Sequence, residues 1–124
     1  MPSERVKRSR RKASAKWKQK NPERAKAITK NSLLKRRFGI TLEEYDSMWA
    51  AQKGLCAICD EPETAPDAHN PNIARRLAVD HCHQTNKIRG LLCSSCNMGI
   101  GQFEDKPSLL VRAKEYLEKF KWIR

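Results

Sequence analysis

Residues 77–101 hold most of the side chains that can do chemistry. Asp80 and His81 are adjacent there, and they combine a hard oxygen ligand for a divalent metal with a proton acceptor. Asn97 adds a second hard oxygen ligand in the same stretch. These residue types predict metal-dependent hydrolysis, in which a metal and a base act on one substrate.

The same stretch carries half of a second metal site, which is made of cysteines. The chain has two Cys-x-x-Cys pairs: Cys56 with Cys59, and Cys93 with Cys96. Each short turn presents two thiolates to one ion, and two such turns complete the tetrahedral shell of a structural zinc. An alternative ligand set stays open, in which the fifth cysteine, Cys82, binds zinc with His81 or His83.

The composition predicts a small domain that needs such a metal. Of the 124 residues, 39% are hydrophobic and 6% aromatic, so the apolar core is small and a structural metal is one way to stabilise it. No apolar run approaches the roughly 18 residues of a membrane span, and the N-terminus lacks the apolar segment of a secretion signal. We therefore expect a cytoplasmic protein without a membrane partner, whose thiolates bind metal rather than form disulfides.

The positive charge is concentrated at the N-terminal end. Residues 1–38 hold 15 Lys and Arg against two acidic residues, whereas residues 39–124 hold 11 against 12, within a total net charge of +12. A basic arm of this kind suits a polyanion such as DNA, because each neutralised phosphate releases counterions. A solubilising or localisation tail is the alternative, and a membrane surface is disfavoured because Trp17 is the one large anchor before Ile28.

The local patterns predict helices on both sides of a hairpin. Residues 1–20 are polar and without a clear period, so disorder is expected there. A helix is expected over 22–38, ended by Gly39, and a capping box from Thr41 to Glu44 begins another that ends before residue 54. Its core positions are expected to be Leu42, Tyr45, Met48 and Trp49.

Strands are predicted at 77–79 and 88–92, with a polar turn at 84–87 between them. Residues 62–71 read as a loop, in which His69 is expected to be solvated. After the second cysteine pair a short helix carries Asn97, interrupted at the nearby glycines. A last helix begins at Pro107, with a core stripe of Leu109, Ala113, Tyr116, Leu117 and Phe120.

Several of these motifs occur in an order that resembles one family, the phage recombination endonuclease VII family of the HNH, or His-Me finger, nucleases. The similarity covers roughly residues 34–120. The motifs are Cys56-x-x-Cys59, Val79-Asp80-His81, the run Lys87-Ile-Arg-Gly-Leu-Leu-Cys-x-x-Cys-Asn97, and a closing Leu-x-x-Ala-x-x-Tyr-Leu helix.

The resemblance implies an α+β fold: a small zinc-stapled ββα-metal (His-Me finger) domain flanked by helices, with a basic N-terminal arm. It implies that Asp80 and Asn97 bind a catalytic Mg²⁺ or Mn²⁺ and that His81 is the general base. The structural zinc then belongs to the four cysteines: Cys56, Cys59, Cys93 and Cys96. Strict strand alternation would point Asp80 and His81 to opposite faces, so the strand must end or open at this pair.

The sequence departs from the family at two places. Cys82 stands where the family often has an acid, and residues 98–101 lack a carboxylate that some members place just after the asparagine. His83 either contacts the scissile phosphate or braces the loop. Arg89 is a candidate phosphate ligand, although an arginine in a hairpin more often faces solvent.

The expected function is a metal-dependent HNH-type DNA endonuclease that hydrolyses phosphodiester bonds, with branched DNA such as Holliday junctions as a possible substrate class. The alternative is a non-catalytic zinc-bound DNA-binding module. We expect residues 1–38 to form a partly disordered or helical DNA-binding arm and residues 39–124 the nuclease domain. The resemblance also suggests a homodimer, acting in the host cytoplasm if a phage encodes the protein.

Overall fold

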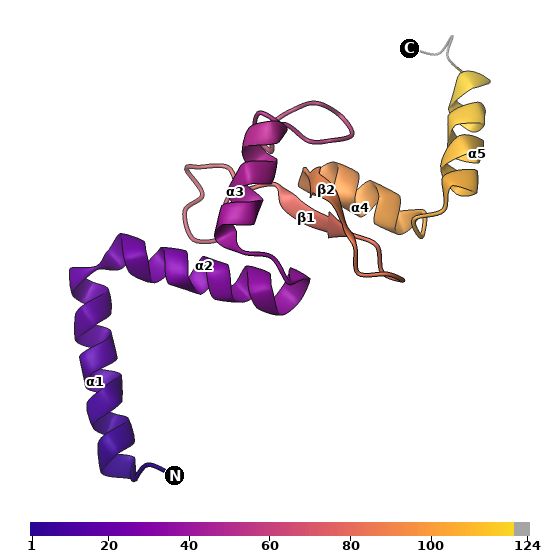
Figure 1. The fold of residues 1–124 in the computed structure, drawn as a ribbon. Helices are drawn as coiled ribbons and strands as arrows, with labels where there is room; N and C mark the ends of the chain where they lie inside the picture. Colours follow the sequence, from indigo (N-terminus) through magenta and orange to yellow (C-terminus); the bar gives the residue numbers. More distant parts are fainter. Residues whose placement is uncertain (121–124) are drawn as a thin grey trace. The chain divides into compact units, whose positions relative to one another are not determined.

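The computed structural model describes residues 1–120 and has an α+β architecture of five helices and one two-stranded sheet (Figure 1). The chain divides into two compact units, Met1–Asp46 and Ser47–Arg124. Within residues 1–120, no helix is both long and apolar enough to cross a membrane.

The N-terminal unit begins with helix α1 (Glu4–Lys20), so the expectation of disorder over residues 1–20 is wrong. The side chain of Ser3 caps the helix by accepting a hydrogen bond from the Val6 N–H at 3.3 Å, and Glu4 places an acid in the positive first turn. Lys and Arg are good helix formers. A polar sequence without an apolar stripe can therefore still be helical.

Helix α2 (Pro22–Phe38) has the predicted bounds. Pro22 begins it, and Gly39 ends it in a left-handed conformation with φ 71° that favours glycine. Helix α3 (Leu42–Ala51) follows, and its capping box forms as expected: the Glu44 N–H donates to Thr41 Oγ1 at 3.0 Å. Of the four predicted core positions of α3, Tyr45 is buried and the others are half-buried.

Strands β1 (Ala78–His81) and β2 (Ile88–Leu92) form the predicted antiparallel hairpin. The first strand starts one residue later than expected and continues through the Asp-His pair. Leu91 and Leu92 are among the most buried side chains, so the hairpin supplies much of the small core. Helix α4 (Ser94–Gln102) follows β2 directly and contacts β1 (Figure 1). It runs without interruption through both of its glycines.

Helix α5 (Pro107–Glu118) begins at the predicted proline, but its expected core stripe is largely exposed. Leu109 and Ala113 are half-buried, whereas Tyr116 and Leu117 are 62% and 67% exposed. The spacing of apolar residues identifies a helix and its apolar side, but it does not say whether another element covers that side.

Candidate active site

The four cysteines of the two Cys-x-x-Cys pairs come together. Their sulfur atoms all lie within 4.8 Å of one another, and the Sγ atoms of Cys59 and Cys93 are 3.8 Å apart. A tetrahedral zinc with bonds of about 2.3 Å holds its sulfurs about 3.8 Å apart, whereas a disulfide bond is about 2.05 Å long. This four-cysteine cluster therefore suits a structural metal such as zinc, as the sequence predicts.

Backbone amides shape both cysteine turns for metal binding. The Ile58 N–H donates to Cys56 Sγ, and the Cys96 N–H donates to Cys93 Sγ, each at 3.4 Å. Hydrogen bonds of this kind orient the sulfur atoms and stabilise thiolate charge. The turns are therefore built to hold charged sulfur.

When no metal balances their charge, the clustered thiols and their burial oppose ionisation, as the pKa of Cys96 shows. Burial and the neighbouring thiols raise the pKa of Cys96 to about 12. Burial also opposes ionisation of Cys56, but backbone N–H donors outweigh it and lower the pKa of Cys56 to about 6. A bound Zn²⁺ would offset this cost of ionisation, because its charge favours the thiolate form of all four cysteines.

Cys82 and His69 lie outside the four-cysteine cluster. The Cys82 N–H donates to the Lys87 carbonyl at 2.8 Å in the hairpin turn, and a hydrogen bond with the Thr85 side chain lowers the pKa of Cys82. His69 is exposed in the long loop, as expected. Over residues 1–120, the four cysteines are the one group of three or more His, Cys, Asp or Glu whose ligand atoms gather closely. The alternative ligand set with Cys82 is not formed.

A β-bulge lies at the Asp-His pair. Asp80 pairs with Gly90, but His81 pairs with Ile88, so Arg89 has no partner residue in β1. Bulges of this kind bend a strand and re-aim side chains near functional sites. The extra residue, Arg89, lies in β2, and β1 continues through both Asp80 and His81. The prediction that the first strand ends or opens at this pair is therefore wrong, and the irregularity lies in its partner strand.

Arg89 binds Asp80 although its side chain stays partly exposed to solvent. Its Nε donates to Asp80 Oδ2 at 2.7 Å and its Nη2 to Asp80 Oδ1 at 2.8 Å. The same Nη2 donates to Asp105 Oδ2 at 3.3 Å. The hydrogen bond to Asp80 and the charges of both carboxylates raise the pKa of Arg89 above its usual range, so the guanidinium stays charged. Asp80 is 9% exposed.

The two histidines of the hairpin contact each other. The rings of His81 and His83 meet edge to face, with their centroids 4.7 Å apart. His83 Nε2 lies 3.9 Å from Asp105 Oδ2. Asn97 is half-buried in the first half of α4. The predicted site residues therefore come from β1, the hairpin turn and the helix that contacts β1.

Glu63 fixes helix α4, which the sequence did not indicate. Its buried carboxylate accepts hydrogen bonds from the Ser94 N–H at 2.6 Å and from Ser94 Oγ at 3.1 Å, and from the N–H groups of Thr64 and Ala65 at 3.0 Å. Burial disfavours its charged form, but these donors outweigh burial and lower the pKa of Glu63. Glu63 thus ties the long loop to the helix that carries Cys96.

Gln52 attaches the end of α3 to the hairpin, which was also not evident from the sequence. Its Nε2 donates to the carbonyls of Leu55 and Leu91 at 2.8 and 2.9 Å, and its Oε1 accepts from the Leu91 N–H at 3.0 Å. The Leu91 carbonyl also accepts from the Ala57 N–H at 3.1 Å. The first cysteine turn and the edge of β2 are therefore joined to each other.

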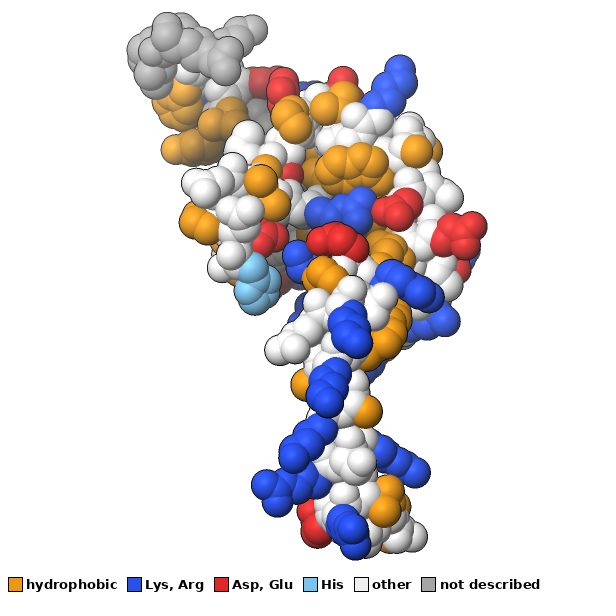
Figure 2. All heavy atoms as spheres, turned by 90° about the vertical axis from the view of Figure 1, so that its left-hand side faces the viewer, with side chains coloured by type: hydrophobic (Ala, Val, Ile, Leu, Met, Phe, Trp, Pro, Cys, Tyr) orange, Lys and Arg blue, Asp and Glu red, His pale blue; other side chains and the backbone are white. Residues whose placement is uncertain are grey.

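Helices α1 and α2 carry the basic arm, residues 1–38, and Figure 2 shows Lys and Arg side chains along its surface. The two acids of the arm meet lysines, Glu4 with Lys7 at 3.0 Å and Glu23 with Lys26 at 3.7 Å. Neither helix has a buried residue. The large positive excess of the arm is therefore exposed to solvent.

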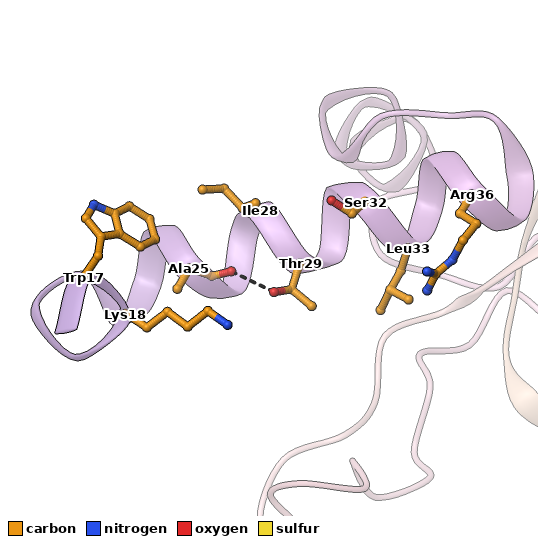
Figure 3. A pocket seen from close by; sticks show the side chains of 8 residues that line it. All are labelled: Trp17, Lys18, Ala25, Ile28, Thr29, Ser32, Leu33 and Arg36. Carbon is orange, nitrogen blue, oxygen red and sulfur yellow. Dashed lines mark hydrogen bonds between the residues drawn. The ribbon is translucent and has the colours of Figure 1, made fainter. Parts of the chain in front are cut away.

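A shallow groove of about 340 Å³ runs from the end of α1 along α2 (Figure 3). Trp17, Ile28 and Leu33 give it an apolar lining, and Lys18 and Arg36 add positive charge. The other lining residues are Ala25, Thr29 and Ser32. The arm thus combines exposed charge with apolar surface.

Comparison with known proteins relates the chain to phage proteins. It is 41% identical over 83 residues to the Gene 59 protein of Mycobacterium phage D29, an alignment that covers 66% of this chain and 46% of that protein. It is 38% identical over 81 residues to the Gene 59 protein of Mycobacterium phage L5, with coverage of 64% and 44%. The chain spans less than half the length of either phage protein.

Among solved structures, the chain is similar to the beta-beta-alpha-Me type II restriction endonuclease Hpy99I, with 28% identity and a TM-score of 0.44 over 72% of this chain and 48% of that one. The family profile described as recombination endonuclease VII matches residues 31–119. That range includes the four-cysteine cluster, the bulged hairpin and Asn97, and this chain belongs to the recombination endonuclease VII family.

Proposed function

We propose that the protein is a metal-dependent DNA endonuclease of the HNH, or His-Me finger, type that hydrolyses phosphodiester bonds. The observation that carries this proposal is the bulged hairpin with Asp80 and His81, followed directly by the helix that carries Asn97. Membership of an endonuclease family supports it.

In this proposal Asp80 and Asn97 hold a catalytic Mg²⁺ or Mn²⁺. Their carboxylate and amide oxygens are ligands that suit these ions. In this structure both Asp80 oxygens bind a cationic group, the Arg89 guanidinium, so the divalent ion would have to displace Arg89 from them. When bound, the divalent ion stabilises negative charge on the phosphate and on the leaving 3′ oxygen.

The chain's own groups do the remaining work. An imidazole nitrogen of neutral His81 accepts the proton of the attacking water. His83, in edge contact with that ring, orients it or contacts the scissile phosphate. A zinc bound by the four-cysteine cluster would hold the first cysteine turn and the start of α4 together, and α4, which carries Asn97, contacts β1.

DNA is the proposed partner, and the basic arm is its main electrostatic contact. Exposed Lys and Arg along α1 and α2 suit the phosphate backbone. The groove of Figure 3 adds an apolar surface beside cations, a combination found where proteins hold nucleic-acid strands. Branched DNA such as a Holliday junction is the proposed substrate class. Cutting two strands symmetrically favours a homodimer, and the phage relatives favour the host cytoplasm.

The second candidate is a non-catalytic zinc-bound DNA-binding module. The bidentate ion pair between Arg89 and Asp80 favours it, because an ion pair of this kind can be purely structural. In such a module, Asp80 and His81 shape the hairpin and do not act on DNA.

Nicking of supercoiled plasmid separates the two candidates. Zinc-loaded protein, freed of other metals by dialysis, is incubated with plasmid with and without added MgCl₂ or MnCl₂; a chelator is avoided because it also removes zinc. The nuclease nicks only with added metal, whereas the binding module retains plasmid without cutting it. Matched duplex, nicked, mismatched and four-way-junction DNA, cut by the same preparation, then identify the substrate class.

A further inference from the structure

Arg89 stands between two carboxylates. It makes a bidentate pair with Asp80, at 2.7 and 2.8 Å, and Nη2, which is part of that pair, also reaches Asp105 Oδ2 at 3.3 Å. Arg89 is the bulge residue of β2, and its side chain is 37% exposed. It is therefore less confined than Asp80, whose side chain is 11% exposed.

Asp105 comes from the turn between α4 and α5, outside the hairpin. The turn is closed by a hydrogen bond from the Asp105 N–H to the Ile100 carbonyl at 2.9 Å. Asp105 Oδ2 also lies 3.9 Å from His83 Nε2. One carboxylate oxygen of Asp105 thus faces both Arg89 and His83 of the proposed site. The residues just after Asn97, 98–101, include no carboxylate.

We propose that Asp105 is a positioning residue of the site, which draws Arg89 away from Asp80 so that the Asp80 carboxylate can bind a divalent cation. This inference rests on the proposed function, because it assumes that Asp80 is a metal ligand.

Arg89 competes with a divalent cation for Asp80. The guanidinium uses both carboxylate oxygens, so the cation would have to bind the same atoms. Leaving Arg89 without a partner would be costly, since its charge is partly desolvated. Asp105 offers the guanidinium a second charge-assisted partner within a short movement.

The net charge leads to the same conclusion. Asp80 and Arg89 alone form a neutral pair, which attracts a cation weakly. With Asp105 added, the three groups carry a net charge of −1, which favours binding of a divalent ion. Asp105 therefore acts through Arg89 and does not have to touch the metal.

Binding of MnCl₂ to the zinc-loaded full chain tests the proposal without using activity. Affinity is measured by electron paramagnetic resonance of free Mn²⁺. The variants are Arg89→Gln, Asp105→Asn and the double variant, with Glu104→Gln as the matched control, since exposed Glu104 pairs with Lys106 at 2.8 Å. Asp80→Asn removes the charge of the proposed metal ligand, so the Mn²⁺ binding that this variant loses is binding at the proposed site.

Arg89→Gln should tighten Mn²⁺ binding and Asp105→Asn should weaken it, each by roughly tenfold or more, the usual strength of a charge-assisted hydrogen bond. In the Arg89→Gln background, Asp105→Asn should have little further effect. Glu104→Gln should bind like the wild type. If Arg89→Gln does not fold, Arg89→Lys should tighten binding by a smaller factor, because it keeps the charge and loses the bidentate fork.

Two outcomes overturn the role of Asp105. One is that Asp105→Asn weakens Mn²⁺ binding by the same factor in the wild type and in the Arg89→Gln background. Asp105 would then act on the metal as a direct ligand or through its general charge. The other is Mn²⁺ binding that is unchanged in folded Asp105→Asn or in a folded arginine variant. If Asp80→Asn binds Mn²⁺ like the wild type, the metal site of the proposed function itself is wrong.

Discussion

At the scale of single residues, the spacing of the cysteines determines the most consequential contacts. A structural zinc contributes on the order of 10–16 kcal/mol of apparent binding energy, which is also folding energy. Cys56→Ser and Cys96→Ser should therefore give unfolded or aggregated protein without bound zinc. Zinc per chain, measured by mass spectrometry, and circular dichroism check this prediction.

Cys82→Ser is the matched control. Cys82 lies outside the four-cysteine cluster, so this variant should fold and bind zinc as the wild type does. Loss of zinc from Cys82→Ser would show that the ligand assignment is wrong.

The four-cysteine cluster could be predicted from the sequence because two cysteine pairs with the same two-residue gap match what a tetrahedral zinc requires. Asp80, His81 and Asn97 could be singled out by residue type and by the family resemblance. The contacts of Arg89 and Asp105 with this site could not be predicted from the sequence. Their contacts depend on a bulge that shifts the strand register and on a turn 16 residues beyond Arg89, and neither feature has a sequence signal of its own.

At the scale of elements, the carboxylate of Glu63 holds the start of α4. Glu63→Gln replaces a charged acceptor of several hydrogen bonds with a neutral amide, and it should lower the free energy of unfolding by about 1–3 kcal/mol at neutral pH. Urea unfolding of the zinc-loaded protein measures this effect. Glu61→Gln, an exposed neighbour in the same loop, should stay close to the wild type.

The contribution of Glu63 should depend on pH in a defined direction. Its native pKa lies below the ordinary value of 4.5, so the folded state binds the proton more weakly than the unfolded state. The stabilisation is fully present above about pH 4.5 and is lost as the pH falls through the native pKa. The difference between wild type and Glu63→Gln should shrink in acid, relative to Glu61→Gln. A difference that grows in acid would contradict the assignment.

Element boundaries were predictable where the backbone chemistry is local. Pro22 and Gly39 set the ends of α2 because proline suits a helix start and a left-handed residue ends a helix. The environment of α5 was not predictable, because its apolar face has a helical period whether or not another element covers it. The helix in residues 4–20 was missed because its stability comes from capping and from good helix formers rather than from an apolar stripe.

At the scale of the whole molecule, the basic arm should determine how DNA binding depends on salt. Changing five cations of α1 to Gln keeps helix-forming residues and removes charge: Lys7, Arg8, Arg10, Arg11 and Lys12. The slope of log affinity against log salt should flatten by about 0.9 for each phosphate that the variant no longer neutralises. Fluorescence anisotropy over a salt series measures this slope.

A variant with Arg112→Gln and Lys114→Gln in α5 is the control for general charge removal, and it should retain most of the slope. If the arm variant has the wild-type slope, the arm has no role in binding phosphates.

His81 is the proposed base of the nuclease, and single-turnover nicking of supercoiled plasmid with Mg²⁺ tests this central role most directly. The loop histidine variant His69→Ala is the matched control. Zinc-loaded His81→Ala should keep its fold and DNA affinity and nick roughly 10²–10⁴-fold more slowly, the usual contribution of a general base, while His69→Ala nicks at the wild-type rate. A folded, zinc-loaded His81→Ala protein that nicks as fast as the wild type would contradict the mechanism and leave His81 a structural residue of the hairpin.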